Sequence, residues 1–184
     1  PFLMAGMDRA VERGIRAIES QEAITVFCDY DVDGVTSAAF LTHFFRDLKN
    51  PVSAYLPERK AEGYGLNSDA IRKIREQGST LMITADCGIT GVKEVALANE
   101  LGLDVIVTDH HQVGEEGLPN AVAVLNPHRD ECNYPFRFLS GVGLAFKLAI
   151  AIRSKLHSAG RKKEDLPNLK RHLDLFALGT IADV

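Results

Sequence analysis

Three aspartates stand at alternate positions in the stretch FCDYDVDGVTSAAF, residues 27–40. Asp29, Asp31 and Asp33 directly follow an apolar run and precede a segment with helical periodicity. Alternate residues of an extended chain project to the same side, so two of these carboxylates could each reach a different divalent ion. A solvated loop and a calcium loop are the alternatives. An EF-hand loop needs a bidentate Glu at its twelfth position, where this chain has Phe40, so the calcium loop fails.

Further side chains with metal-ligand chemistry follow other apolar runs. Asp86 follows LMITA and is suited to bridging two ions, and Asp109, His110 and His111 follow DVIVT as a DHH triplet. Carboxylates with one or two imidazoles suit Mn²⁺, Mg²⁺, Fe²⁺ or Zn²⁺, and the excess of acids favours the harder ions. Asp183, near the end of LDLFALGTIADV, offers one more carboxylate, although its spacing equally fits a loop acid without a ligand role.

Two bound ions indicate hydrolysis at phosphorus. They can generate a nucleophile from water at neutral pH, neutralise a phosphate and support in-line attack. Such a site needs neither a Ser–His–Asp arrangement nor a Gly-Lys-Ser/Thr phosphate loop.

The elements that must position these residues alternate along the chain. Buried strands are predicted at 24–28, 52–56, 81–85, 104–108 and 121–125, and helices at 7–19, 34–49, 67–77, 91–101, 141–157 and 168–178. The alternation predicts a doubly wound, Rossmann-like α/β fold with a parallel five-stranded sheet, flanking helices and C-terminal helices. Ligands of such sheets bind beyond the carboxyl ends of the strands, and here all five runs are followed by polar residues: DYDVDG, PERKAEGYG, DCG, DHH and NPH.

Composition limits the class of protein. The 184 residues, 46% of them apolar, fit one domain (1–184), which we expect to be excised from a longer chain. No run approaches the roughly 18 apolar residues of a membrane helix. Three cysteines without paired spacing favour a reducing cytoplasm; Cys28 and Cys87 neighbour candidate ligands, but small buried residues are the favoured interpretation. The six candidate aspartates outnumber the net charge of −4, so a polyanionic substrate is not excluded.

Two loops could contact such a substrate. In PERKAEGYGLNSD, Arg59 and Lys60 could bind phosphates and Tyr64 could stack on a base, or the segment is a polar loop with a partly buried Tyr. SGVG opens a predicted helix, so the amides at Gly141 and Gly143 could hold a phosphate. Equally, these glycines could merely allow close packing.

Six blocks in order carry a family resemblance: VFCDYDVDGVTSAAFL, GYGLN, TADCGIT, VTDHH, LSGVGLAFKL and LDLFALGTIADV. Over essentially all 184 residues the chain resembles the DHH phosphoesterase superfamily, and most closely its RecJ-type branch of bacterial single-strand-specific exonucleases. The resemblance implies 5′-to-3′ hydrolysis of single-stranded DNA in repair and recombination, with two Mn²⁺ ions preferred, or Mg²⁺. It implies the ligands Asp31, Asp33, Asp86, His110 and Asp183, with Asp86 bridging, Asp29 and Asp109 among or just behind them, and His111 on the scissile phosphate.

One difference from the superfamily pattern favours the RecJ-type branch. Many smaller relatives have a His four residues before the equivalent of Asp31, where this chain has Phe27. The resemblance also implies a cleft-closing second domain and nucleic-acid-binding modules outside these residues, where a helicase or single-strand-binding protein could bind. Same-chemistry rivals are hydrolysis of short oligonucleotides, cyclic dinucleotides or pyrophosphate. A receiver-like signalling module also places acids at strand ends, but it does not use a His-His pair there.

Overall fold

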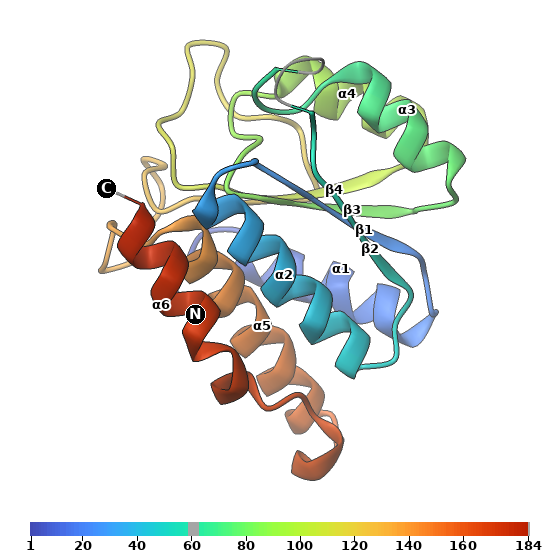
Figure 1. Ribbon diagram of the computed structural model, residues 1–184, viewed down its shortest axis with the longest axis vertical. Coiled ribbons are helices and arrows are strands. Elements are labelled where there is room, and N and C mark those ends of the chain that lie inside the picture. The colour runs from blue at the N-terminus through green and yellow to red at the C-terminus, as the bar shows by residue number, and fades with distance from the viewer. Residues whose placement is uncertain (59–62, 184) are drawn as a thin grey trace.

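A fully parallel five-stranded sheet forms the centre of the computed structural model, which describes residues 1–58 and 63–183 (Figure 1). Its order is β2–β1–β3–β4–β5, and the strands are β1 (Ile24–Cys28), β2 (Val52–Tyr55), β3 (Leu81–Ala85), β4 (Asp104–Thr108) and β5 (Ala123–Leu125). The predicted α/β fold class is therefore confirmed.

The strands differ in how deeply they are buried. Every residue of β1 and β3 is buried, as expected for apolar strands covered on both faces. The prediction of a buried strand at 52–56 was wrong in part, because β2 pairs on one side only and its residues Ser53 and Ala54 are exposed. The predicted strand at 121–125 is shortened to β5.

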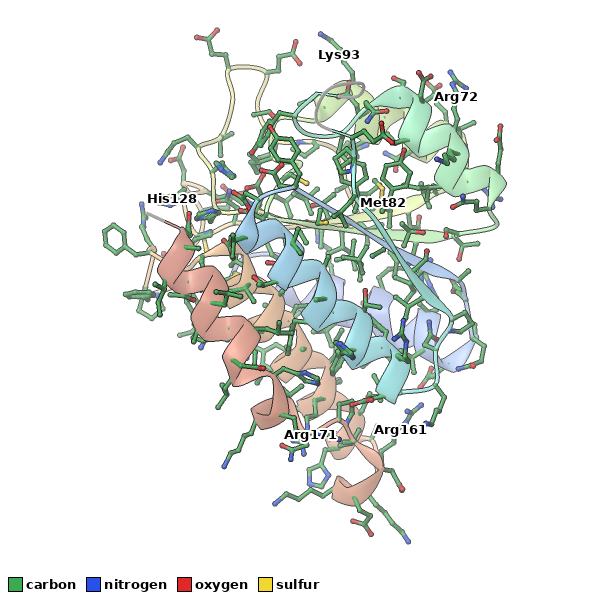
Figure 2. The ribbon with its side chains drawn as sticks, viewed as in Figure 1. Arg72, Met82, Lys93, His128, Arg161 and Arg171 are labelled. Atoms are coloured by element: carbon green, nitrogen blue, oxygen red, sulfur yellow. The ribbon has the colours of Figure 1, made fainter. Side chains whose placement is uncertain are left out.

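Helices cover both faces of the sheet (Figure 1). One face carries α1 (Met7–Glu19), α2 (Val32–Asp47), α5 (Gly141–Ser158) and α6 (Leu173–Ala182), and the other carries α3 (Ser68–Glu76) and α4 (Val92–Glu100). Each face has its own apolar cluster. Met82 lies in the cluster beneath α3 and α4, whereas Arg72 and Lys93 project outward from those helices (Figure 2).

Local hydrogen bonds explain where two helices begin. The predicted start at 34 was two residues late, because the Asp31 side chain accepts from the Gly34 amide and caps α2 from Val32. The predicted start at 168 was too early for α6. The side chain of Asn168 accepts from the Lys170 amide, and Leu169–His172 form a 3₁₀ turn before α6 begins.

The strand order locates the edge where a ligand site is expected. Chain connections from β1 lead to β2 on one side and, further on, to β3 on the other, so the order reverses between these neighbours. In such sheets the crevice lies beyond the carboxyl ends of the strands at that point. We call this edge, from which residues 29, 86 and 109 follow, the carboxyl edge. Within the described residues, we find no helix whose length and apolar character would let it cross a membrane.

Candidate metal centre

Three aspartates form a row along the carboxyl edge. The amide of Asp29 donates to Ala85 O (3.2 Å), that of Asp86 to Thr108 O (3.0 Å) and that of Asp109 to Leu125 O (3.1 Å). Each aspartate thus continues the hydrogen bonding of its own strand to the neighbouring strand. The sheet register therefore positions the three carboxylates.

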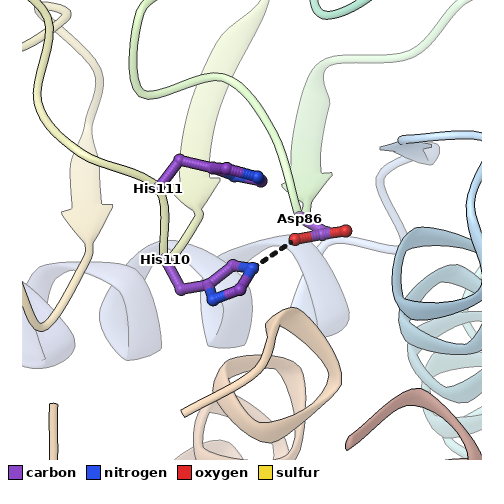
Figure 3. A group of neighbouring side chains, drawn as sticks. All are labelled: Asp86, His110 and His111. Carbon is purple, nitrogen blue, oxygen red and sulfur yellow. Dashed lines mark ion pairs between the residues drawn. The ribbon is translucent and has the colours of Figure 1, made fainter. Parts of the chain in front are cut away.

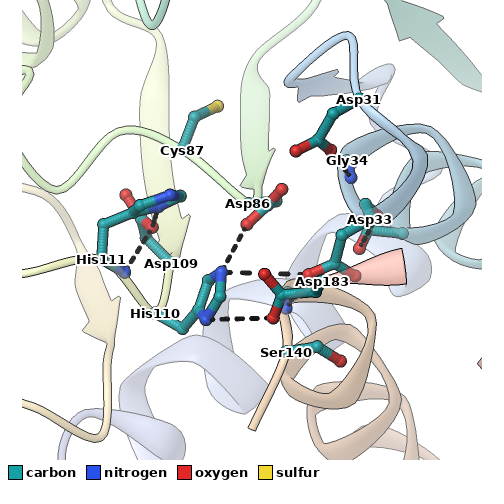
Figure 4. A network of polar contacts seen from close by, with 12 residues as sticks. Asp31, Asp33, Gly34, Asp86, Cys87, Asp109, His110, His111, Ser140 and Asp183 are labelled. Carbon is teal, nitrogen blue, oxygen red and sulfur yellow. Dashed lines mark hydrogen bonds and ion pairs between the residues drawn. The ribbon is translucent and has the colours of Figure 1, made fainter. Parts of the chain in front are cut away.

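Among the described residues, three overlapping groups of side chains could hold metal ions, and Figure 4 labels all their members except Asp29. In each group, one ligand atom per residue lies within 4.8 Å of the others. The groups are Asp29–Asp31–Asp86, Asp86–His110–His111 and Asp33–His110–Asp183; we call these seven residues the ligand cluster. Asp86 and His110 each belong to two groups, and a carboxylate shared in this way can bridge two neighbouring ions.

Asp86 belongs to two of the three groups, and Figure 3 shows it beside His110 and His111. It is 1% exposed, and its φ of 63° is in the left-handed region, which a residue with a Cβ adopts at a cost of order 1–3 kcal/mol. His110 Nε2 lies 2.9 Å from its Oδ1, an ion-pair contact when His110 is protonated, and Oδ1 has no other partner among the described residues. Burial, with the charge of Asp33, raises the pKa of Asp86 to about 7.

The N-terminus of α5 holds Asp33. The Gly141 amide donates to Oδ2 (2.5 Å) and the Val142 amide to Oδ1 (2.8 Å), so the positive end of a long helix faces this carboxylate. Burial still raises the pKa of Asp33, although both amides oppose that shift. Asp33 is 2% exposed, and one of its oxygens lies within 4.8 Å of ligand atoms of His110 and Asp183.

The two glycines of SGVG have different surroundings. The Gly141 amide is engaged by Asp33, and the Gly143 amide donates to the side chain of Ser140, which caps α5. A Cβ on Gly141 would lie 2.6 Å from Asp86 Cβ. Of the two alternatives for these glycines, the geometry favours close packing over phosphate binding.

His110 lies between the side chains of Asp86 and Asp183. Its Nδ1 lies 3.7 Å from Asp183 Oδ2, and its Nε2 lies 3.9 Å from Asp33 Oδ2 (Figure 4). Asp183 ends α6, which packs against α2 and α5. A residue 150 positions after Asp33 therefore completes the same group, as the spacing alone left open.

Asp109 lies behind the ligand cluster and orients His111. Its Oδ2 accepts from the Ile89 amide (2.8 Å), and its Oδ1 accepts from the His111 amide (3.0 Å) and from His111 Nδ1 (2.7 Å). This last hydrogen bond raises the pKa of His111 to about 9. Asp109 belongs to none of the three groups, so of the two places expected for it, the geometry favours the one behind the ligands.

Asp29 and Asp31 complete the first group from the other side. Asp29 is 4% exposed, its Oδ1 accepts from the Tyr30 amide (2.7 Å), and burial raises its pKa. Asp31 is exposed, and one of its oxygens caps α2. Both residues thus retain oxygens that can face an ion.

The loop after β2 is only partly described. Arg59 and Lys60, expected to bind phosphates, lie outside the described residues. Tyr64 is 55% exposed, its hydroxyl lies 3.5 Å from His111 Nε2, and its ring meets that of His111 edge-on. The exposed ring beside His111 favours the stacking alternative over a partly buried structural Tyr.

The cysteines behave as small buried residues. The thiols of Cys28 and Cys87 face the carbonyl oxygens of Tyr55 and Phe27, and neither belongs to a ligand group of the described residues. Burial raises the pKa of Cys28 to about 12 and raises that of Cys87 as well, which disfavours the thiolate that metal binding requires.

Two residues after β5, Asn126 and His128, lie near the site although no role was predicted for them. Asn126 is fully buried; its side-chain amide donates to His111 O (2.8 Å) and its Oδ1 accepts from the His128 amide (2.7 Å). Burial and the nearby charges of His110 and Arg137 lower the pKa of His128. The NPH triplet at the end of the fifth apolar run was the available signal.

These residues fit divalent metal ions. The ligand cluster offers five carboxylates and two imidazoles, the donor set of Mn²⁺ and Mg²⁺ rather than of thiolate-bound metals. Asp86 has a buried oxygen without a hydrogen bond, and burial raises the pKa values of Asp29, Asp33 and Asp86. A bound cation would offset this crowding of like charge.

Known proteins are similar to this chain in sequence and in fold. The model of the DHH family, N-terminal domain, matches residues 23–180. The single-stranded-DNA-specific exonuclease RecJ of Bacillus subtilis is 47% identical over the whole chain, which covers 22% of that protein. RecJ of Escherichia coli is 40% identical over 98% of the chain, which covers 32% of that protein.

Solved structures of RecJ exonucleases have the same fold as this chain. A crystal structure of exonuclease RecJ bound to manganese superposes with a TM-score of 0.85 at 34% identity and covers 98% of this chain and 44% of that chain. RecJ of Thermus thermophilus in complex with Mn²⁺ gives 0.79 at 31% identity, over 98% of this chain and 24% of that chain. The chain thus spans less than half of the proteins it resembles.

Proposed function

Because the chain belongs to the DHH family, we propose that it forms the metal-binding catalytic part of an exonuclease that hydrolyses single-stranded DNA from the 5′ end. Repair and recombination of DNA are the processes in which such an activity serves. The overlap of three ligand groups at Asp86 and His110 is the observation that carries the proposal.

Two divalent ions, Mn²⁺ or Mg²⁺, would supply a water-derived nucleophile at neutral pH and neutralise the charge of the phosphate. Asp29, Asp31 and Asp86 hold one side of the site, and Asp33, His110 and Asp183 hold the other. Asp86 also shares a group with His110, which belongs to the other side, and this supports a bridging role for Asp86.

His111 has a substrate-binding role rather than a structural one. Asp109 accepts from its Nδ1, so the imidazole is oriented with Nε2 toward Tyr64 and the open side of the carboxyl edge. A donor held in this way can bind an oxygen of the scissile phosphate. Tyr64 stacks on the base of a nucleotide whose phosphate lies there.

The test is a hydrolysis assay with added Mn²⁺. End-labelled strands of single- and double-stranded DNA are compared with dinucleotides, a cyclic dinucleotide and pyrophosphate. We expect mononucleotides released from the 5′ end of the single strand, and no product with EDTA. Preferential turnover of the dinucleotides or of pyrophosphate would contradict the proposed substrate.

Two variants make the assay specific to the site. Asp86→Ala removes the shared ligand and should abolish hydrolysis, whereas Asp69→Ala removes an exposed carboxylate of α3 and should leave it unchanged. Cleavage by Asp86→Ala at the wild-type rate would show that the nuclease activity arises elsewhere.

A further inference from the structure

Four consecutive residues near the ligand cluster are exposed, and two of them are phenylalanines. Pro135–Phe138 precede the Ser140 cap of α5, with Phe136 52% and Phe138 83% exposed. The two ring centroids lie 6.0 Å apart in an edge-to-face arrangement. We call Pro135–Phe138 the aromatic strip.

The aromatic strip lies beside the site. Phe138 precedes Gly141 by three residues, a span of at most about 11 Å along an extended chain, and the Gly141 amide binds Asp33. The nearby charge of Arg137 helps to lower the pKa of His128, which follows β5 at the carboxyl edge (Figure 2). The end of the strip therefore lies within about 11 Å of the residue whose amide holds Asp33.

The side chains of the aromatic strip suit a flexible polyanion that carries planar bases. Arg137 stands between the two rings in sequence and is exposed. Of the exposed acids Asp130 and Glu131 in the same loop, Glu131 is paired with Arg129. Phosphates bind arginine, and unpaired bases stack on aromatic rings. A second exposed ring, that of Tyr64, meets the ring of His111 in the ligand cluster edge-on.

We propose that the aromatic strip docks single-stranded nucleic acid, with Phe136 and Phe138 stacking on bases and Arg137 binding a phosphate between them. The inference rests on the proposed function, because it assigns a path to the strand that the site would cleave. Stacking on open rings does not depend on base identity, so the strip holds strands of any sequence.

Binding without hydrolysis tests the strip apart from the chemistry. The anisotropy of a fluorescein-labelled 15-nucleotide oligo(dT) and of an abasic strand of equal length is measured in EDTA. Phe136→Ala/Phe138→Ala should weaken oligo(dT) binding at least about tenfold and leave abasic-strand binding unchanged. Arg137→Gln should weaken both, and Phe2→Ala, an exposed ring at the N-terminus, should weaken neither.

Three outcomes would overturn the inference. The first is equal oligo(dT) affinity of the wild type and the folded double variant, and the second is undetectable binding by the wild type. The third is a wild-type oligomer in sedimentation velocity that the double variant disperses without losing DNA affinity, since the strip would then join copies of the chain. If the double variant loses binding but the wild type hydrolyses nothing, the proposed function fails and the strip stands.

Discussion

Gly141→Ala tests whether the backbone of α5 maintains the metal site. A Cβ at this position would lie 2.6 Å from Asp86 Cβ and 2.9 Å from Asp86 Oδ1. Carbon atoms in contact are separated by about 3.5–4.0 Å, so either the start of α5 or Asp86 must move by about 1 Å. Because the Gly141 amide also donates to Asp33, the substitution disturbs two candidate ligands at once.

The size of the effect follows from these contacts. A hydrogen bond to a charged group contributes about 1.5–3 kcal/mol, and loss of a contact that orients a ligand typically lowers metal affinity about 10–100-fold. We therefore expect Gly141→Ala to weaken Mn²⁺ binding by at least about tenfold, measured by isothermal titration of metal-free protein.

Gly143→Ala is the matched control on the same helix. Its Cβ would meet the end of the flexible Leu139 side chain at 3.2 Å, and its φ is not in the left-handed region. Alanine is also favoured over glycine inside a helix by about 1 kcal/mol. Circular dichroism checks that both variants fold. Wild-type Mn²⁺ affinity in Gly141→Ala, or equal losses in both variants, would refute the reasoning.

Three further substitutions separate ligands, orienting residues and fold. Asp86→Ala should abolish Mn²⁺-dependent hydrolysis. Without metal, the variant should melt at or above the wild-type temperature in scanning fluorimetry, because it lacks a buried carboxylate that lies close to other acids. A markedly lower melting temperature would argue against this. Asp109→Asn should slow hydrolysis about 100-fold or more by releasing His111, while calorimetric Mn²⁺ affinity stays near wild type; a large loss of affinity would make Asp109 a ligand. Burial raises the pKa of Glu22, but hydrogen bonds, including one from Arg13, outweigh burial, so the pKa in the folded protein lies below the usual 4.5. The ionised carboxylate therefore stabilises the fold above about pH 4.5, and this contribution is lost as the pH falls through the folded pKa. Urea unfolding of Glu22→Gln should thus show a deficit of about 1–3 kcal/mol at pH 7 that shrinks below pH 4.5; a deficit independent of pH would contradict this.

Much of the fold could be predicted because burial leaves a clear pattern in the sequence. The strands β1, β3 and β4 and the helix α1 match their predicted bounds, since apolar runs or one apolar helical face define them. Errors arose where tertiary context decides. The position of β2 at the sheet edge depends on which strands pair, and the late start of α6 depends on a local turn at Asn168.

The candidate site was predictable to the extent that topology alone brings residues together. Parallel strands direct all their carboxyl ends to one edge, so the convergence of Asp29, Asp86 and His110 follows from the alternation of elements. The hydrogen bonds from α5 to Asp33 join residues 108 positions apart, and no local pattern indicates them. Nor does sequence reveal that Phe136 and Phe138 are exposed, since apolar residues are usually expected inside.

Anomalous scattering from crystals soaked in Mn²⁺ tests the central claim most directly. The account predicts two peaks about 3.5–4 Å apart at the carboxyl edge, with Asp86 between them, His110 and Asp183 on one side and Asp31 on the other. A single peak, no peak, or two peaks that Asp86 does not join would contradict a two-ion site.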